Sequence, residues 1–153
     1  MIVVFTGTGK GKTTASLGQA VRAVGRGKRA LMIQFIKGPW QSGEDFAEII
    51  RKEDKGGKFE LKKMGLGFVG IMGDTLPREE HIKAAKAALD HFKKEIADWD
   101  LIILDEINVA LLLNLLTEDE VLSAIRNFPL EKLLILTGRS APYSITAVAD
   151  LVT

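Results

Sequence analysis

The sequence of 153 residues contains no cysteine. That absence excludes a disulfide framework, thiolate zinc sites and iron–sulfur clusters held by cysteine. An excess of charge of one sign is also missing, because 21 Lys and Arg residues face 20 Asp and Glu residues, for a formal net charge of +1. A chain this close to neutral has no general attraction for nucleic acid or for an anionic membrane. We therefore expect neither of them as a partner.

Long hydrophobic runs are absent too. No segment stays apolar over the ~20 residues that a membrane-spanning helix needs, and the chain begins with a core-strand pattern instead of a basic segment followed by an apolar one. We therefore expect a cytoplasmic protein. With 46% hydrophobic residues and the length of one ordinary domain, residues 1–153 are expected to form a single nucleotide-binding domain.

A glycine-rich loop follows the first apolar run and has the sequence Gly7-Thr8-Gly9-Lys10-Gly11-Lys12-Thr13-Thr14. It has the composition of a phosphate-binding loop, but only three residues separate its outer glycines, where the ordinary loop has four. Backbone N–H groups in such a loop, together with the start of the following helix, attract anions. We expect all eight residues to bind ATP. Lys12 is expected to reach a phosphate, and the Thr13 hydroxyl to ligate Mg²⁺ (or Mn²⁺).

Short apolar runs and helical patterns alternate along the chain. Four runs lack alternation, which is typical of strands buried on both faces of a parallel sheet: 2–5, 30–35, 101–104 and 133–136. A fifth run, 59–64, alternates more and is expected nearer an edge. Helical patterns cover 12–24, 44–52, 78–99 and 121–128, and Thr117 with Glu120 forms a capping box before the last. This order predicts an α/β fold, a doubly wound and mostly parallel sheet with helices on both faces, as in RecA-like P-loop NTPases.

Two further strands end in residues that suit a nucleotide site. Asp105 and Glu106 follow a hydrophobic strand, a pattern that holds magnesium opposite a phosphate-binding loop. If the strand continues through both, they point to opposite faces, so only one is expected to approach the metal directly. Arg139 follows the strand at 133–136, and its guanidinium can grip phosphate with two donors. A surface arginine that caps the next helix gives the same pattern.

Two glycine-rich loops, 37–44 and 65–70, follow the second and third strands, at the edge where open parallel sheets bind ligands. Each carries one aromatic residue, Trp40 in the first and Phe68 in the second. The two rings either plug their loops or form the walls of a site for a flat, largely apolar ligand beside the nucleotide.

Six ordered motifs together resemble one enzyme family. They are 7–14, Gln34-Phe35-Ile36-Lys37-Gly38 with Trp40 and Gly43-Glu44, Gly65-x-Gly67-Phe68, Leu104-Asp105-Glu106-x-Asn108, Leu136-Thr137-Gly138-Arg139-x-Ala141-Pro142, and Ala149-Asp150-Leu151-Val152-Thr153. The chain resembles, over nearly its whole length, the P-loop type of ATP:corrinoid adenosyltransferases, also called cob(I)yrinic acid a,c-diamide adenosyltransferases.

The resemblance implies a reaction. The 5′-deoxyadenosyl group of ATP passes to the Co(I) centre of a reduced corrinoid (cobalamin, cobinamide or cobyrinic acid diamide), and triphosphate leaves, in adenosylcobalamin biosynthesis or salvage. ATP is held in reversed orientation, with C5′ facing the cobalt. This orientation would explain why the phosphate-binding loop is one residue shorter than the ordinary one. Lys12 and Glu106 become the catalytic residues, and Thr13, Glu106 and Asp105 the metal ligands. Trp40, Gly67 and Phe68 contact the corrinoid, a flavin-based reductase supplies electrons, and the enzyme is a homodimer.

The sequence departs from the family at two points. Gly70 stands where a second aromatic residue is expected two positions after Phe68, so displacement of the lower cobalt ligand is expected to rely on another ring, such as Trp40. The helix that often precedes the first strand, and the segment that follows in relatives, have no counterpart within 1–153. In relatives that helix helps to cover the corrinoid across a dimer, so the resemblance does not by itself extend to the lid and the dimer contact.

Three other functions are compatible with parts of the sequence. A P-loop small-molecule kinase or ATPase would transfer the γ-phosphoryl group of ATP, which the short loop does not favour. An ATP-gated corrinoid carrier would bind the same ligands without turnover. A RecA-like DNA motor would need a basic stripe, which a net charge of +1 does not favour.

Overall fold

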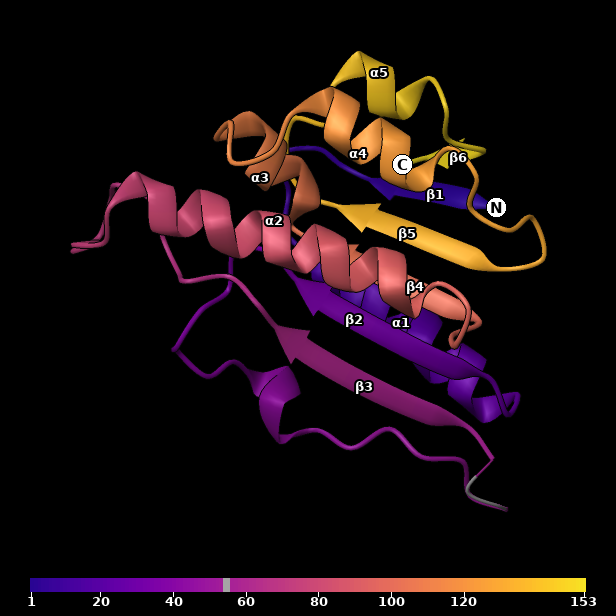
Figure 1. Ribbon diagram of the computed structural model, residues 1–153. Coiled ribbons are helices and arrows are strands. Elements are labelled where there is room, and N and C mark those ends of the chain that lie inside the picture. Colours follow the sequence, from indigo (N-terminus) through magenta and orange to yellow (C-terminus); the bar gives the residue numbers. More distant parts are fainter. Residues whose placement is uncertain (54–55) are drawn as a thin grey trace.

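The computed structural model describes residues 1–53 and 56–153. Within them, six strands form one sheet in the order β3-β2-β4-β5-β1-β6, and each observed pairing is parallel (Figure 1). The strands are β1 (Ile2–Phe5), β2 (Arg29–Gln34), β3 (Lys58–Lys63), β4 (Leu101–Asp105), β5 (Leu133–Thr137) and β6 (Leu151–Val152). The α/β class and the parallel sheet are confirmed, and β3 lies at an edge as its alternating pattern predicts.

Helices cover both faces of the sheet. They are α1 (Lys12–Gly25), the 3₁₀ turn η1 (Gly43–Phe46), α2 (Arg78–Glu95), α3 (Ile107–Leu112), α4 (Glu118–Ile125) and α5 (Tyr143–Thr146). On one face, Ala20 and Val24 of α1 pack with Met32 of β2. On the other, Leu31 and Ile33 of β2 pack with residues of α2, α3 and α4. Neighbouring residues of β2 thus pack into the cores on opposite faces of the sheet, which is why that strand is apolar on both faces.

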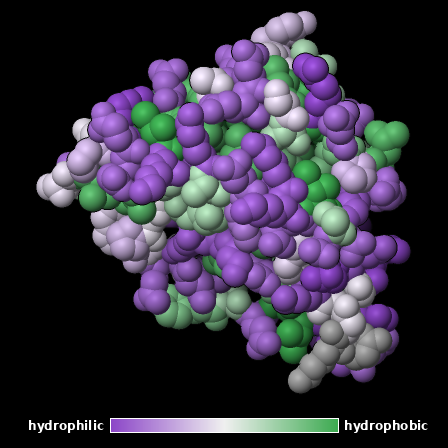
Figure 2. Space-filling view, viewed as in Figure 1, coloured by the Kyte–Doolittle hydropathy of each residue, from purple (hydrophilic) through white to green (hydrophobic). Residues whose placement is uncertain are grey.

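The outer surface agrees with this layering. Viewed from the side of α2, the molecule is mainly hydrophilic, with scattered apolar residues (Figure 2). Within the described part of the chain, no helix is long and apolar enough to cross a membrane.

The predicted helix over 44–52 is wrong. Only the single turn η1 forms, closed by a capping box of Ser42 and Asp45, and the backbone becomes extended at Ala47. This segment returns from the carboxyl end of β2 to the amino end of the parallel strand β3, so it must travel the length of the sheet. Six extended residues span roughly 20 Å, whereas six helical residues span roughly 9 Å. The apolar side chains of Phe46 (75% exposed) and Ile50 (56% exposed) remain in solvent.

The other element boundaries differ from the predicted ones by a few residues. Helix α2 ends at Glu95, before Trp99, although Trp99 is still buried. Helix α4 begins at Glu118, directly after Thr117 of the predicted capping box, in which Glu120 N–H donates to Thr117 Oγ1 at 3.2 Å, and it ends at Ile125. The short elements α3, α5 and β6 were not predicted. Because all strands are parallel, the loops after β1, β2, β3, β4 and β5 meet at one edge, where parallel sheets place their ligands.

Candidate functional site

The glycine-rich loop presents backbone N–H groups at the start of α1. Gly7 (φ 101°) and Gly11 (φ 108°) adopt left-handed conformations that favour glycine. Gly11 is the N-cap of α1 and has no side chain to cover the first N–H groups of the helix. Lys12 folds back over the loop, and its Nζ donates to the carbonyl oxygens of Gly7 (2.8 Å) and Gly9 (2.5 Å). The loop therefore combines helix-terminal N–H groups with an ammonium group, as an anion site requires.

Asp105 joins this loop to the middle of the sheet. The carboxylate is fully buried, and its Oδ1 accepts hydrogen bonds from Thr13 Oγ1 and Thr137 Oγ1, both at 2.8 Å. Its Oδ2 accepts from Gln34 Nε2 at 3.1 Å. The two predicted metal ligands Thr13 and Asp105 are thus in direct contact.

Glu106 lies in the same site, but its backbone has left the strand conformation. Strand β4 ends at Asp105, and Glu106 takes a left-handed conformation (φ 63°, ψ 21°), with its N–H donating to Thr137 Oγ1 at 2.9 Å. The strand does not continue through both acids, so the expected division between two faces does not apply. Asp105 and Glu106 both lie at the same edge of the sheet.

The side chain of Glu106 borders a cavity of about 190 Å³ together with Arg139 and residues 9–14. Its Oε2 is buried and has no hydrogen-bond partner among residues 1–53 and 56–153. Burial raises the pKa of Glu106, and the neighbouring charge of Asp105 raises it further, while Lys12, Lys37 and Arg139 act in the opposite direction. A buried oxygen without a partner, at a cavity that Thr13 also lines, fits a hard cation such as Mg²⁺.

The protein groups at this site are too few to enclose a cation alone. No group of three or more His, Cys, Asp or Glu side chains in the described part of the chain is arranged to hold a metal. Mg²⁺ commonly takes one or two carboxylates and completes its shell with substrate phosphates and water. The donor set of Thr13, Asp105 and Glu106 therefore suits a cation that arrives with a nucleotide.

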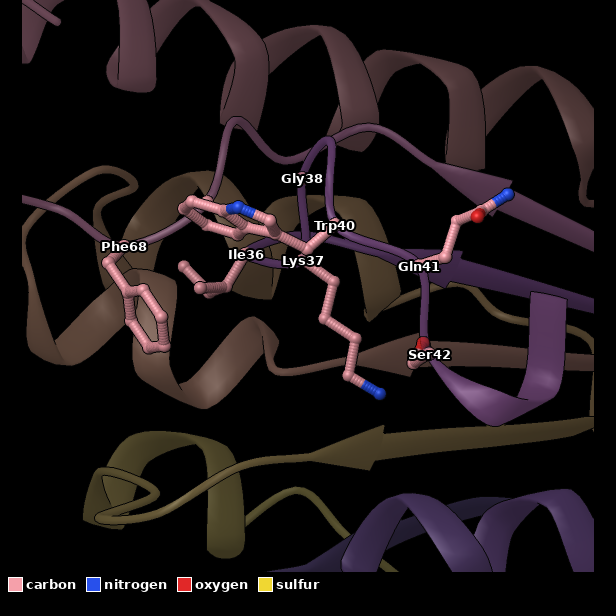
Figure 3. Close-up of a pocket in the computed structure, with 8 residues that line it drawn as sticks. Ile36, Lys37, Gly38, Trp40, Gln41, Ser42 and Phe68 are labelled. Atoms are coloured by element: carbon pink, nitrogen blue, oxygen red, sulfur yellow. The ribbon is translucent and has the colours of Figure 1, made fainter. Parts of the chain in front are cut away.

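A second hollow, of about 270 Å³, lies beside the loops that follow β2 and β3 (Figure 3). The rings of Trp40 and Phe68 are 5.6 Å apart between centroids and tilted by 40°. Trp40 is 57% exposed and Phe68 43% exposed, so neither ring fills an interior gap as a loop plug would. Gly67 (φ 101°) passes under the indole, and a Cβ there would lie 2.5 Å from a Trp40 ring carbon. The wall is apolar and open to solvent.

Comparison with known proteins identifies the family. The family model "ATP:corrinoid adenosyltransferase BtuR/CobO/CobP" matches residues 1–153. The chain belongs to this family. It is 39% identical over 154 aligned positions to the corrinoid adenosyltransferase of Escherichia coli (strain K12), and 40% identical over 154 positions to corrinoid adenosyltransferase CobA of Salmonella typhimurium; each alignment covers 99% of this chain and 74% of the relative. The corrinoid adenosyltransferase of Pseudomonas aeruginosa is 34% identical over 155 positions, covering 100% of this chain and 73% of the relative.

The structure of this corrinoid adenosyltransferase also contains site residues that sequence reasoning did not assign. Gln34 Nε2 donates to both Asp105 Oδ2 (3.1 Å) and Glu44 Oε1 (3.0 Å), and Lys37 forms an ion pair with Glu44. Thr137 supports the turn between Asp105 and Glu106. Gln34 and Thr137 are the last residues of β2 and β5, Lys37 lies in the loop after β2, and Glu44 lies in η1, all at the edge of the sheet where the motifs gather. That position was the signal that could have found them.

Proposed function

We propose that this corrinoid adenosyltransferase transfers the 5′-deoxyadenosyl group of ATP to the Co(I) centre of a reduced corrinoid and releases triphosphate. The cobalt electron pair forms the Co–C5′ bond, the C5′–O bond breaks, and its electron pair leaves on triphosphate, so Co(I) becomes Co(III). The observation that carries the proposal is the pairing of a shortened phosphate loop with an open aromatic hollow at the same edge of the sheet. A loop that grips the triphosphate tail leaves C5′ to face the second substrate.

The residues of the phosphate cavity stabilise the charge on the leaving triphosphate. Backbone N–H groups of residues 7–11 and the ammonium group of Lys12 bind the phosphate oxygens, and Arg139, which also lines the cavity, contributes a guanidinium. Thr13, Asp105 and Glu106 would hold Mg²⁺ (or Mn²⁺), which supplies further positive charge for the leaving group when bound. Because reduced cobalt is itself the nucleophile, the site has no need for a general base.

Trp40, Gly67 and Phe68 form the proposed contact with the corrinoid. Gly70 has a left-handed backbone (φ 69°), and its N–H donates to Asp74 Oδ2 at 2.8 Å, so this position contributes a fixed turn instead of a ring. The second ring beside Phe68 is that of Trp40. We propose that this pair excludes the lower cobalt ligand, the task that the expected aromatic at position 70 would have performed.

Two further parts of the proposal concern the partners. The chain has no cysteine, so neither a dithiol nor a cysteine-held cluster of its own can deliver an electron to cobalt. We propose a flavin-based reductase as the electron donor, and a cytoplasmic homodimer as the assembled form. Sedimentation at micromolar concentration tests the second point, and a monomer would contradict it.

The products of ATP distinguish this function from its alternatives. The protein is incubated without oxygen with ATP, Mg²⁺ and chemically reduced cobalamin. We expect equal amounts of triphosphate and a light-sensitive cobalt–carbon product, and a loss of at least about 100-fold in rate for Lys12→Ala. Orthophosphate in place of triphosphate would support a kinase or ATPase. Saturable corrinoid binding without either product would support a carrier.

A further inference from the structure

The loops that carry Trp40 and Phe68 are in direct backbone contact. Gly67 N–H donates to the carbonyl oxygen of Ile36 at 2.9 Å. A Cβ added at Gly38 would lie 2.3 Å from the Gly67 nitrogen, and one added at Gly65 would lie 2.4 Å from the Ile36 carbonyl carbon. The backbones leave no room for side chains between them. We therefore treat loops 36–43 and 64–70 as one unit, so a force on one displaces both.

Lys37 belongs to this unit but its charged end leaves the aromatic hollow. The side chain runs away from the Trp40 ring (Figure 3). Its ammonium group forms an ion pair with Glu44 and lies 3.8 Å from Asp105 Oδ2. Glu44 is 12% exposed, Asp105 is fully buried and Lys37 is 30% exposed, so water screens these interactions only in part. Lys37 thus connects a loop of the proposed corrinoid site to the carboxylate beside the phosphate loop.

The contacts continue from Asp105 to the nucleotide site without a gap. Asp105 Oδ1 accepts the hydrogen bond from Thr13, and Asp105 Oδ2 faces both Gln34 and Lys37. Gln34 also donates to Glu44, so the same amide group holds both carboxylates that Lys37 faces. A chain of four residues therefore runs from Thr13 through Asp105 and Lys37 to Glu44.

The charges on this chain respond to what binds at Thr13. Burial alone would raise the pKa of Glu44, but hydrogen bonds from Lys37, from its own backbone and from Gln34 lower the pKa to about 2, so it stays ionised at neutral pH. Lys37 therefore faces two carboxylates, Glu44 and Asp105. Any charge introduced beside Asp105 changes the balance between them, because Coulomb forces are strong over 4 Å in a buried site.

We propose that Lys37 is a positioning residue that couples occupancy of the ATP site to the shape of the aromatic hollow, so that ATP changes the affinity for the corrinoid. This inference rests on the proposed function, because it assigns both ligands to their sites. Lys37 has two states in this proposal. In one state Lys37 contacts both Asp105 and Glu44, and in the other it contacts Glu44 alone. The loop that carries Lys37 shifts between these two states. By thermodynamic reciprocity, the corrinoid changes the affinity for ATP by the same factor.

The test measures this coupling factor directly. Cob(II)inamide is used as the probe, because its cobalt is not the nucleophile and no transfer occurs, and its Kd is measured by calorimetry with and without saturating ATP and Mg²⁺. We expect wild type to show a change of about fivefold or more. We expect Lys37→Met to reduce it below about twofold, and Lys37→Arg to restore most of it. Glu44→Gln, which weakens the same link from the other side, is expected to behave like Lys37→Met.

Lys63→Met is the matched control. Lys63 holds the same loop, with Nζ donating to the Trp40 carbonyl oxygen (2.7 Å) and to Asp45 (2.5 Å), but these contacts do not lead to Asp105. This variant should weaken corrinoid binding by the same factor with and without ATP, leaving the coupling intact. Coupling retained in both Lys37→Met and Glu44→Gln, or wild type that binds both ligands independently, would overturn the inference and leave the proposed function standing. Wild type that binds neither ligand would overturn both.

Discussion

At the scale of single residues, Glu106 combines two features that cost stability. Its backbone lies in the left-handed region, which a residue with a Cβ rarely adopts, and its buried Oε2 has no partner in the described part of the chain. Burial and the charge of Asp105 also raise its pKa, so the ionised form is disfavoured. Such features are common at functional sites, where a residue is suited to binding a ligand at some cost to the stability of the fold.

Glu106→Gln tests this view. Removing the charge should stabilise the protein without nucleotide by about 1 kcal/mol, because a neutral amide is easier to bury than a carboxylate. The same change should slow adenosyl transfer by at least about tenfold and raise the Mg²⁺ concentration needed for half-maximal rate. Urea unfolding and initial rates measure the two effects. Glu131→Gln, at an exposed position, should alter neither. A less stable Glu106→Gln protein with normal rates would show that the carboxylate is structural.

At the scale of elements, the pairing of strands explains which site residues could be predicted. Lys12, Thr13, Asp105 and Glu106 stand in recognisable local motifs, and the structure brings them together. Gln34 ends a predicted strand, but its contact with Asp105 could not be predicted, because Asp105 is 71 residues away and the two meet only through the register of β2 beside β4. A strand pattern indicates that a strand exists, but not which strand lies next to it.

The missed and mispredicted elements have physical reasons of the same kind. Helix α3 has only six residues, and four of them are buried, so it shows no polar face by which an amphipathic helix is recognised. The segment 44–52 has helix-forming residues, but the direction of the crossover between two parallel strands overrides that preference. In both places tertiary context decides what the local sequence leaves open.

Gly38→Ala tests the contact between the two loops. The new methyl group would lie 2.3 Å from the backbone nitrogen of Gly67, so the loops must separate. We expect a loss of about 1–3 kcal/mol in unfolding free energy and a corrinoid Kd at least about tenfold weaker, with ATP affinity within twofold of wild type. Urea unfolding and calorimetry measure these quantities. Gly43→Ala is the control, because nothing lies within 4 Å of a Cβ there. Unchanged corrinoid binding by Gly38→Ala would refute the interlocked arrangement.

At the scale of the whole molecule, ionised carboxylates in several separate elements contribute to stability. Among residues 1–53 and 56–153, six carboxyl groups have a pKa below the ordinary value: Glu44, Asp45, Glu60, Asp74, Asp100 and Glu120. For Glu60, hydrogen bonds from Lys58 and then Lys62 lower the pKa from 4.5 to about 2. These groups are spread over the turn η1, the edge strand β3, the loops before α2 and β4, and helix α4. Their protonation therefore affects the fold as a whole, not one site.

Stability should accordingly fall in acid. A carboxyl group with a lowered folded pKa contributes stability above its ordinary pKa, and this contribution is lost as the pH falls through the folded value. For Glu44 and Glu60 that window runs from 4.5 down to about 2. Glu106 acts in the opposite sense, since its raised pKa means that protonation relieves a penalty, but within the described residues it is one group against six. We expect the urea midpoint to fall steeply below about pH 4.5, and Glu60→Gln to flatten part of that fall. A midpoint at pH 3 equal to that at pH 6 would mean that these ion pairs contribute nothing to the native state.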